Sequence, residues 1–239
     1  MAYGCWKSGG IVMIKLDNVT KTFGLGTSGL TDITLSIEKG EFVFVVGPTG
    51  SGKTTLFRLL IRDMIPTKGS IVVGDYDLVK LPKQKIPHLR KKVGVVFQNL
   101  KLLSDRTIFE NILLPLEFVK VNEQDAKKKV EEIMEHVGIS AHKDKFPIQL
   151  SGGELQRAAI ARALVLDPEI LLADEPTGNL DPVTSKEIVK LLAKINETGT
   201  TIIIATHNHE IVNDLAKRVL ALEKGHLIRD QKKGKYGNS

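Results

Sequence analysis

Eight consecutive residues constrain this chain more than any other part of its sequence. Residues 47–54 read GPTGSGKT and fit the spacing G-x-x-x-x-G-K-[S/T], in which glycines let the backbone wrap closely around a polyphosphate. The apolar run 42–46 precedes this loop, and the helical-looking stretch 55–64 follows it. N–H groups at the start of a helix carry partial positive charge toward a bound anion. The pattern therefore predicts a strand, a phosphate-binding loop and a helix in succession.

Two side chains at the end of the loop have the chemistry that a phosphate site needs. Lys53 would place a positive charge near the β and γ phosphates, and the Thr54 hydroxyl could coordinate Mg²⁺. The alternative is a glycine-rich turn that ends in Lys-Thr by chance. The strand and helix patterns on either side disfavour that alternative.

Apolar, β-rich runs recur along the chain, and several are unbroken rather than alternating, which is typical of strands covered on both faces. They lie at residues 42–46, 93–97, 170–173, 201–205 and 219–222. Between them, residues 130–137 and 188–195 carry apolar side chains at i, i+3, i+4 and i+7, which is the spacing of one helix face. Strands that alternate with helices predict an α/β core with a mostly parallel sheet.

Other parts of the chain have different patterns. The first 40 residues and residues 70–73 read as short strands broken by glycines, which predicts an antiparallel β layer beside the core. A helical subdomain is expected at roughly residues 99–165. We expect residues 13–239 to form one domain, and we set residues 1–12 apart as an N-terminal extension because they are Gly-rich and hold the only Trp and Cys.

Composition excludes several classes of protein. The chain has 239 residues and is 42% hydrophobic, so a sizeable core is available, yet no apolar run approaches the ~18 residues that span a bilayer. If this protein works at a membrane, something else must hold it there. The formal charge of +6 is too mild and too scattered to indicate nucleic acid, and none is expected as a partner. A single cysteine, Cys5, excludes an internal disulfide and suits a reducing compartment without requiring one.

A phosphate-bound metal ion needs a carboxylate, and Asp174 and Glu175 stand at the end of an apolar run. Ligands collect at the carboxyl ends of parallel strands. Asp174 would accept a hydrogen bond from a Mg²⁺-bound water, and Glu175 could polarise the water that attacks the γ phosphate. Acids at a strand exit often only begin a loop, but the phosphate loop elsewhere in the chain favours the functional interpretation.

Residues 150–154 read LSGGE, which we call the Leu-Ser-Gly-Gly segment. Ser151 and Glu154 have the spacing of a capping box at the start of a helix. A cap does not explain two consecutive glycines, which weaken a first helical turn but let a ligand approach the backbone amides. The segment therefore predicts a second element that contacts phosphate.

Six features occur in a recognisable order: the phosphate loop, Gln98 after a strand, the Leu-Ser-Gly-Gly segment, the two acids at the strand end, Asp181 and His207. Over residues 13–239 the chain resembles the ABC ATPases. The Leu-Ser-Gly-Gly segment is specific to that family, whereas many NTPases share the phosphate loop. The resemblance implies a P-loop NTPase core with an antiparallel β layer and a helical subdomain. It also implies hydrolysis of ATP to ADP and phosphate, with Mg²⁺.

The resemblance assigns roles to individual residues. ATP would be bound by Phe23, Gly47, Pro48, Thr49, Gly50, Ser51, Gly52, Lys53, Thr54 and Thr55, and Mg²⁺ by Thr54, Gln98 and Asp174. The catalytic residues would be Glu175, His207 and Gln98. Phe23 would stack on adenine, where most members have tyrosine, so the ring is kept and the hydroxyl is lost. Without the resemblance, a lone His after a strand would be read as an ordinary loop residue.

In this family two copies face head to tail. Residues Ser151, Gly152, Gly153 and Glu154 of one chain would then close on the ATP held by the phosphate loop of the other, and Asp181 would couple the two chains. ATP would act as the adhesive between the copies, and hydrolysis would remove it.

Residues 173–181, ADEPTGNLD, resemble the branch with lipoprotein-release, macrolide-efflux and cell-division ATPases. Residues 95–103 and the basic tail 229–237 are similar to the cell-division members, although a basic tail is often only a disordered end. This implies an ATP-dependent homodimer at the cytoplasmic face of the plasma membrane, bound to an integral membrane protein of FtsX type that regulates cell-wall hydrolases. The alternative is a lipoprotein-release or efflux ATPase. A soluble ABC protein acting on DNA or ribosomes is disfavoured by the short, single ATPase unit.

The apolar residues of 100–103, which follow Gln98, have two interpretations. Leu102 and Leu103 could pack wholly into this domain, or some could stay exposed and form a groove for a helix of the membrane partner. A helix docked beside Gln98 would respond to the nucleotide state.

Overall fold

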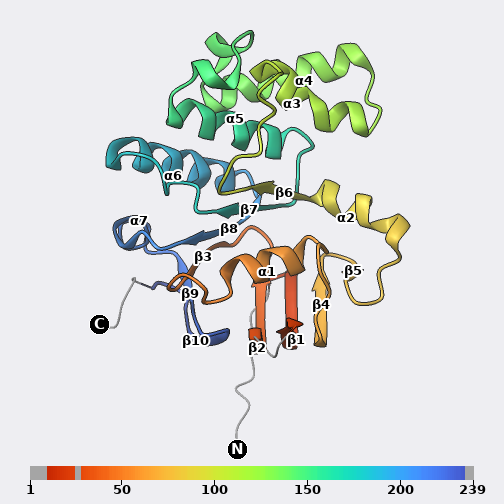
Figure 1. The fold of residues 1–239 in the computed structure, drawn as a ribbon, viewed down its shortest axis with the longest axis vertical. Helices are drawn as coiled ribbons and strands as arrows, with labels where there is room; N and C mark the ends of the chain where they lie inside the picture. The colour runs from red at the N-terminus through yellow and green to blue at the C-terminus, as the bar shows by residue number, and fades with distance from the viewer. Residues whose placement is uncertain (1–9, 25–27, 235–239) are drawn as a thin grey trace, which may run out of the picture.

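The computed structural model describes residues 10–24 and 28–234, whose helices and strands lie in layers (Figure 1). The strands are β1 (Val12–Thr22), β2 (Ser28–Glu38), β3 (Phe42–Val46), β4 (Lys68–Val73), β5 (Tyr76–Asp77), β6 (Val93–Val96), β7 (Ile170–Asp174), β8 (Thr201–Thr206), β9 (Arg218–Glu223) and β10 (His226–Gln231). The α-helices are α1 (Lys53–Leu60), α2 (Ile86–Lys92), α3 (Ile108–Phe118), α4 (Glu123–Val137), α5 (Gly152–Leu164), α6 (Pro182–Glu197) and α7 (His209–Leu215). Short 3-10 helices are η2 (Lys83–Lys85), η3 (Ser140–His142) and η4 (Pro147–Gln149).

The central sheet has the strand order β10-β9-β3-β8-β7-β6, and all neighbours pair in parallel except β10 with β9. The predicted α/β core with a mostly parallel sheet is therefore confirmed. β3 shows why its apolar run is unbroken. Phe42, Phe44 and Val46 point to one face of the sheet and pack with residues of α3 to α7. Val43 and Val45 point to the other face and pack with residues of α1, β1, β2 and β4.

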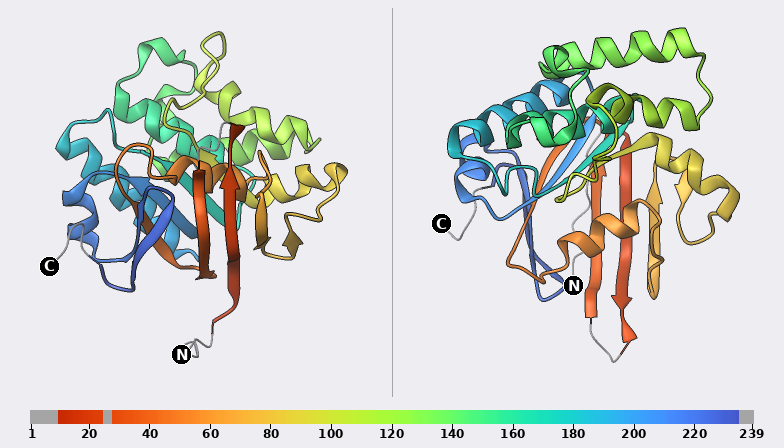
Figure 2. Two further views of the ribbon diagram at one scale, coloured as in Figure 1. Left: turned by 60° about the horizontal axis from the view of Figure 1, so that its bottom comes forward. Right: turned by 45° about the horizontal axis from the view of Figure 1, so that its top comes forward.

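The remaining strands form the predicted antiparallel layer, in the order β2-β1-β4-β5. α1 lies between this layer and the central sheet, and it buries Leu56, Phe57, Leu59 and Leu60 (Figures 1 and 2). The structure corrects two predicted boundaries near this layer, the start of the first strand and the end of the helix after the phosphate loop. β1 already begins at Val12, inside the segment that was set apart, and α1 ends at Leu60 rather than near residue 64. Residues 1–9, and residues 235–239 of the basic tail, lie outside the described residues.

Helices α3, α4 and α5 contact one another and lie at the end of the molecule opposite the antiparallel layer (Figure 1). α4 follows its predicted stripe, because Val130, Met134 and Val137 are buried while Ile133 is only partly covered. Asn122 caps its first turn, and Gly138 ends it in left-handed backbone. Within residues 10–24 and 28–234, none of the helices has the length and apolar character to cross a bilayer.

Arg218 at the start of β9 joins the layers. Its guanidinium pairs with Asp230 of β10 at 2.7 Å and with Glu41 before β3 at 2.9 Å. The same group donates to the Ser36 carbonyl of β2 at 2.8 Å. Because Arg218 is buried and both acids are largely covered, this network fixes the edge of the central sheet against the antiparallel layer.

Gly94 in β6 is a site of close packing between the sheet and α5. A Cβ atom there would lie 2.4 Å from the Ala163 carbonyl oxygen and 3.1 Å from Pro168 Cγ. We predict that Gly94→Ala lowers the free energy of unfolding by about 1–3 kcal/mol, because a backbone oxygen cannot turn aside. Thermal unfolding followed by circular dichroism should show a Tm lower by about 2–4 °C for each kcal/mol. Gly24→Ala, which adds a methyl group in open space, is the control, and equal Tm values for the two variants would contradict the prediction.

Candidate functional site

The loop between β3 and α1 is shaped by three glycines with positive φ. Gly47 has a φ of 148°, Gly50 a φ of 80° and Gly52 a φ of 110°. A Cβ atom on Gly47 would lie 2.1 Å from the Leu222 carbonyl oxygen, and one on Gly52 would lie 2.5 Å from the Gly29 carbonyl oxygen. Only glycine fits at Gly47 and Gly52, which lets the loop curl tightly into the start of α1.

The N-terminus of α1 has no side-chain cap. Gly52 occupies the N-cap position, and the first turn holds no acidic residue. The amides of Lys53, Thr54 and Thr55 therefore have no acceptor within the helix, and these three residues line a pocket. An uncapped helix start of this kind binds anions.

The side chains of Lys53 and Ser51 are buried beside this helix start. Lys53 Nζ donates to the carbonyl oxygens of Gly47 at 2.7 Å and Pro48 at 3.2 Å. One of its three N–H groups is therefore left for a ligand. Ser51 Oγ has no hydrogen-bond partner among the described residues. Both observations fit phosphate oxygens bound at this loop.

Asp174 ends β7 and lies beside the loop. Its Oδ2 accepts a hydrogen bond from Thr54 Oγ1 at 3.1 Å. Burial raises the pKa of the Asp174 carboxyl above its ordinary value, the hydrogen bond from Thr54 acts in the opposite direction, and the charge of Glu175 raises the pKa further. The ionised form is therefore disfavoured in the protein alone, and a nearby cation would stabilise it.

Glu175 follows Asp174 in a strained conformation. Its φ is 49°, in the left-handed region that residues with a side chain rarely adopt. The Glu175 amide donates to the Ala205 carbonyl of β8 at 2.8 Å, which holds this backbone in place. Its Oε1 lies 2.9 Å from His207 Nδ1, and its Oε2 accepts from the His207 amide at 3.3 Å. The Glu175 side chain is only 10% exposed, whereas that of His207 is 67% exposed.

The pocket, of about 350 Å³, gathers most of the predicted residues in one place. It is lined by Phe23, Ser28, Gly29, Thr49, Gly50, Ser51, Gly52, Lys53, Thr54, Thr55, Gln98, Asp174, Glu175 and His207. Gly47 and Pro48 do not line it, but their carbonyl oxygens accept hydrogen bonds from Lys53 Nζ. Ser28 and Gly29 were not predicted, because no local pattern connects the start of β2 with the phosphate loop.

The Leu-Ser-Gly-Gly segment lies outside this pocket, at the start of α5. The expected capping box is present: Ser151 Oγ accepts from the Glu154 amide at 3.4 Å, and Glu154 Oε2 accepts from the Ser151 amide at 2.7 Å. A Cβ atom on Gly153 would lie 2.6 Å from Thr184 Cγ2. One on Gly152 would lie 3.1 Å from Leu180 Cδ2. Close packing against the start of α6 is thus a second reason for the two glycines.

Asp181 also lies outside the pocket and caps α6. Its carboxylate accepts from the amides of Val183 and Thr184, both at 3.0 Å. The side-chain and backbone hydrogen bonds with Thr184 lower the pKa of the Asp181 carboxyl. Asp181 therefore begins the helix against which the Leu-Ser-Gly-Gly segment packs.

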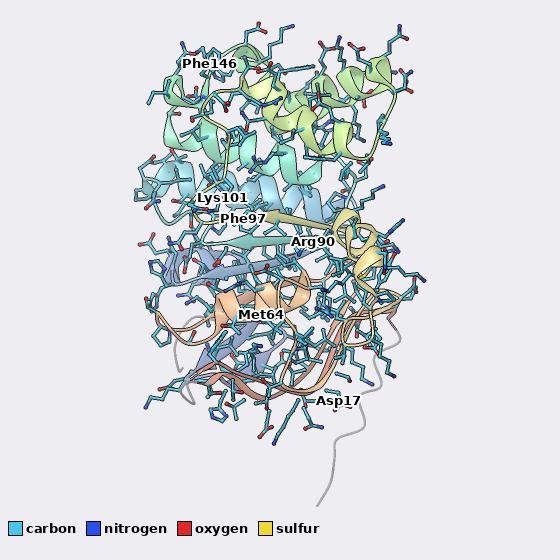
Figure 3. All side chains as sticks on the ribbon, turned by 45° about the vertical axis from the view of Figure 1, so that its right-hand side comes forward. Asp17, Met64, Arg90, Phe97, Lys101 and Phe146 are labelled. Carbon is cyan, nitrogen blue, oxygen red and sulfur yellow. The ribbon has the colours of Figure 1, made fainter. Side chains whose placement is uncertain are left out.

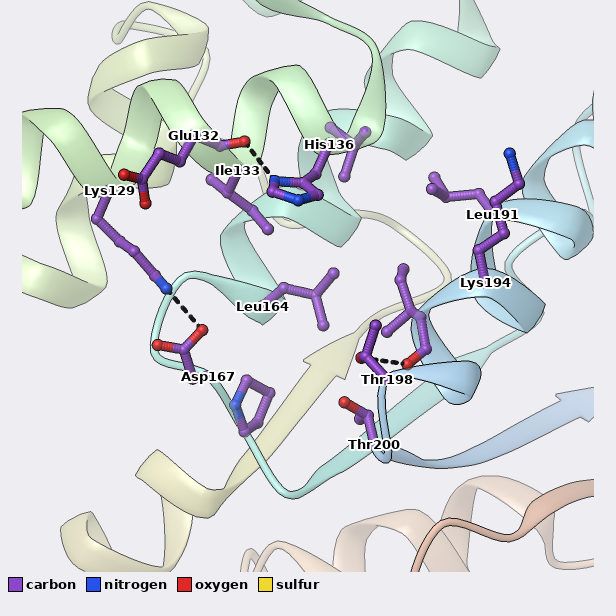
Figure 4. A pocket seen from close by; sticks show the side chains of 13 residues that line it. Lys129, Glu132, Ile133, His136, Leu164, Asp167, Leu191, Lys194, Thr198 and Thr200 are labelled. Carbon is purple, nitrogen blue, oxygen red and sulfur yellow. Dashed lines mark hydrogen bonds and ion pairs between the residues drawn. The ribbon is translucent and has the colours of Figure 1, made fainter.

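A larger cavity, of about 500 Å³, lies between α4, the end of α5 and α6 (Figure 4). Ile133, Leu164 and Leu191 are among its lining residues, and Lys129 pairs there with Asp167 at 2.7 Å. No residue predicted to bind nucleotide lines it. Its lining includes neither the phosphate loop nor Asp174 and Glu175, which distinguish the smaller pocket.

The raised pKa of Asp174 leads to a prediction about stability. Since ionisation is disfavoured in the folded state, the destabilisation is present above the folded-state pKa and disappears at lower pH. Asp174→Asn, which removes the charge, should therefore raise the Tm of the nucleotide-free protein at pH 7, by about 2–4 °C for each kcal/mol of stability regained. Scanning calorimetry at pH 7 and pH 4 measures the effect, which should shrink at the lower pH. A lower Tm for the variant at pH 7 would refute it.

Comparison with known proteins identifies the family. The profile described as "ABC transporter" matches residues 30–178. The chain is 48% identical to the cell division ATP-binding protein FtsE of Streptococcus pneumoniae, over 94% of this chain and 98% of that protein. It is 46% identical to the protein of the same name from Bacillus subtilis, over 95% of this chain and 99% of that protein.

A solved structure of a relative shows the same fold. It is a dimeric, post-hydrolysis state of the ATP-binding cassette MJ0796 bound to ADP and Pi, with a TM-score of 0.85 and 35% identity. The match covers 94% of this chain and 100% of the MJ0796 chain. This chain therefore belongs to the ABC transporter family and is an ATP-hydrolysing member of it.

Proposed function

We propose that this chain binds Mg-ATP, closes into a homodimer around it, and drives an FtsX-type membrane protein in bacterial cell division. The single observation that carries the proposal is the pocket that joins the phosphate loop to Asp174, Glu175 and His207. The cell-division role rests on the relatives named FtsE, which are 46% and 48% identical over nearly the whole chain. No observation favours the lipoprotein-release or efflux alternative over it.

Phosphate and metal would be held by different groups of the pocket. The free amides at the start of α1, Ser51 and Lys53 would bind the phosphate oxygens. Thr54 Oγ1, Gln98 and the Asp174 carboxylate would hold Mg²⁺, which supplies positive charge at the β and γ phosphates. Among the described residues no group of three or more His, Cys, Asp or Glu side chains is arranged so that the group by itself could hold a metal ion. Mg²⁺ usually takes one or two carboxylates and completes its shell with water and phosphate, so the residues fit this ion.

Hydrolysis would use the pair formed by Glu175 and His207. The Glu175 carboxylate orients a water molecule toward the γ phosphorus and accepts its proton as the new P–O bond forms and the bond to ADP breaks. His207 fixes one carboxylate oxygen by the 2.9 Å contact, and its exposed ring would contact the γ phosphate. Phe23, which is 40% exposed, would cover the adenine.

The dimer would complete the site. Ser151 and Gly152 are exposed and do not line the pocket of their own chain, so this segment is accessible to the nucleotide of another copy. The similar MJ0796 cassette is dimeric with ADP and Pi. Gly153 packs on Thr184, whose amide is capped by Asp181. Closure of the dimer on ATP at the Leu-Ser-Gly-Gly segment would therefore displace the start of α6.

The membrane partner would dock beside Gln98. Leu100 and Leu102 pack against the core, whereas Leu103 is 38% exposed and Phe97 is 40% exposed. Packing into the domain thus applies to Leu100 and Leu102, whereas exposure at the surface applies to Leu103. We propose that Phe97 and Leu103 contact a helix of the partner, which would hold this chain peripherally at the cytoplasmic face of the membrane.

Glu175→Gln tests the chemistry. The variant keeps the size of the side chain but cannot accept the proton, so ATP should bind and persist. Size-exclusion chromatography with Mg-ATP should show a stable dimer, and the hydrolysis rate should fall at least about 100-fold, as expected for loss of a general base. Adding Lys53→Ala should weaken ATP binding and abolish this dimer. Rapid hydrolysis by Glu175→Gln would exclude the proposed role.

A matched pair of substitutions tests the docking surface. Leu103→Asp should weaken capture of the FtsX-type protein from detergent-solubilised membranes about tenfold or more, while the affinity for ATP stays within about twofold. Leu102→Asp places a charge against the core and should instead lower the Tm. Normal capture by folded Leu103→Asp would count against the docking surface.

A further inference from the structure

The turn that follows Gln98 has an unusual backbone. Leu100 and Lys101 both have a φ of 55°, although neither is glycine. The Leu100 amide donates to the Phe97 carbonyl at 2.9 Å, and the Lys101 amide donates to the Asn99 carbonyl at 2.5 Å. Two consecutive left-handed residues with side chains persist only where surrounding contacts hold them.

One side chain of α5 supplies such contacts. Arg162 donates from one terminal nitrogen to the Leu100 carbonyl at 2.6 Å and from the other to the Lys101 carbonyl at 2.7 Å. Figure 3 labels Phe97, which follows β6, and Lys101 of this turn close to each other. The planar fork of a guanidinium matches two neighbouring oxygens, which a lysine ammonium cannot do.

The environment of Arg162 shows that these carbonyls are its main partners. Among the described residues no carboxylate lies within ion-pair distance of it. Burial lowers the pKa of the Arg162 guanidinium. The Arg162 side chain is partly removed from water, and its hydrogen bonds go to backbone carbonyls. Its role is therefore to hold the backbone of the turn and not to neutralise a carboxylate.

Asn111 of α3 holds the far end of the same segment. Its Oδ1 accepts from the Leu103 amide at 2.7 Å, and its Nδ2 donates to the Leu103 carbonyl at 3.0 Å. Asn111 is 0% exposed. The chain from Phe97 to Leu103 is thus fixed at two points, and Arg162 holds the one that is nearer to Gln98 along the chain.

α5 carries a second functional element at its other end. The Leu-Ser-Gly-Gly segment begins the helix at Ser151, and Arg162 lies in its last turn. A continuous helix without glycine or proline after Gly153 moves as a rigid rod. The turn after Gln98 and the Leu-Ser-Gly-Gly segment are therefore attached to the same rod.

We propose that Arg162 is a positioning residue that fixes Gln98 relative to the Leu-Ser-Gly-Gly segment, so that one helix sets the geometry of both elements. The inference rests on the proposed function, because it concerns how Gln98 and Ser151 act together on nucleotide. Without Arg162 the turn relaxes and Gln98 loses its place, while the phosphate loop between β3 and α1 is unchanged.

Arg162→Gln tests the inference, with Arg157→Gln as the matched control. Arg157 lies on the same helix and also donates to a backbone carbonyl, that of Val137 at 2.9 Å, and it pairs with Glu187 at 3.0 Å. Hydrogen exchange of residues 97–103 in the nucleotide-free protein should be at least about 10- to 100-fold faster in Arg162→Gln, the factor for one charge-assisted hydrogen bond, because two such bonds are lost. Arg157→Gln should leave exchange in this segment unchanged.

Steady-state kinetics supply the second measurement. In Arg162→Gln, kcat should fall about tenfold or more while the affinity of the monomer for a fluorescent ATP analogue stays within about twofold, because only positioning is lost. Arg162→Lys keeps the charge and can reach one carbonyl, so its kcat and its exchange should lie between those of the wild type and Arg162→Gln. Arg157→Gln should keep kcat within about twofold of the wild type.

Unchanged exchange of residues 97–103 in Arg162→Gln would overturn the inference, as would an equal loss of kcat in Arg157→Gln. If Arg162→Gln does not fold, Arg162→Lys is compared with the wild type and must show faster exchange. A wild-type protein that does not hydrolyse ATP would refute the proposed function instead, and the exchange measurement would still decide whether Arg162 holds the turn.

Discussion

The parallel pairing of β3, β8 and β7 determines where the functional groups of the pocket lie. The register sets Val46 beside Thr206 and Ala205 beside Asp174. The carboxyl ends of the three strands therefore lie side by side, and together they form what we call the carboxyl edge of the central sheet. From this edge the chain continues into the phosphate loop, the Glu175 turn and the His207 segment. A slip of one residue in β7 would exchange its two faces and separate the Asp174 carboxylate from Thr54, because successive side chains point to opposite sides.

Several features at this edge are unfavourable for the isolated fold. The Asp174 carboxyl is buried, the Glu175 backbone is left-handed, α1 has no cap, and Ser51 Oγ lacks a partner among the described residues. Each is a group that a bound nucleotide or metal ion would satisfy. The double cover of the central sheet, with an apolar core on each face, supplies the stability that such a site requires.

Sequence alone predicted the parts that depend on neighbouring residues. The spacing of residues 47–54 indicated the phosphate loop, the unbroken apolar runs indicated a sheet covered on both faces, and Ser151 with Glu154 indicated a helix cap. These features arise from hydrogen bonds and periodicities within a few residues. The position of Gln98 and the roles of Phe23 and His207 came from the family resemblance, because no local pattern distinguishes them from ordinary loop residues.

Tertiary structure alone decided which distant segments meet. Ser28 and Gly29 reach the pocket because the antiparallel layer packs on α1, and the glycines of the Leu-Ser-Gly-Gly segment fit closely against α6. Nothing in the sequence marks Leu100 and Lys101 as left-handed, or Arg162 as their support, since left-handed backbone without glycine leaves no local signature. The relative placement of strands and helices is decided by the burial of apolar surface across the whole chain, and a short window of sequence does not contain that information.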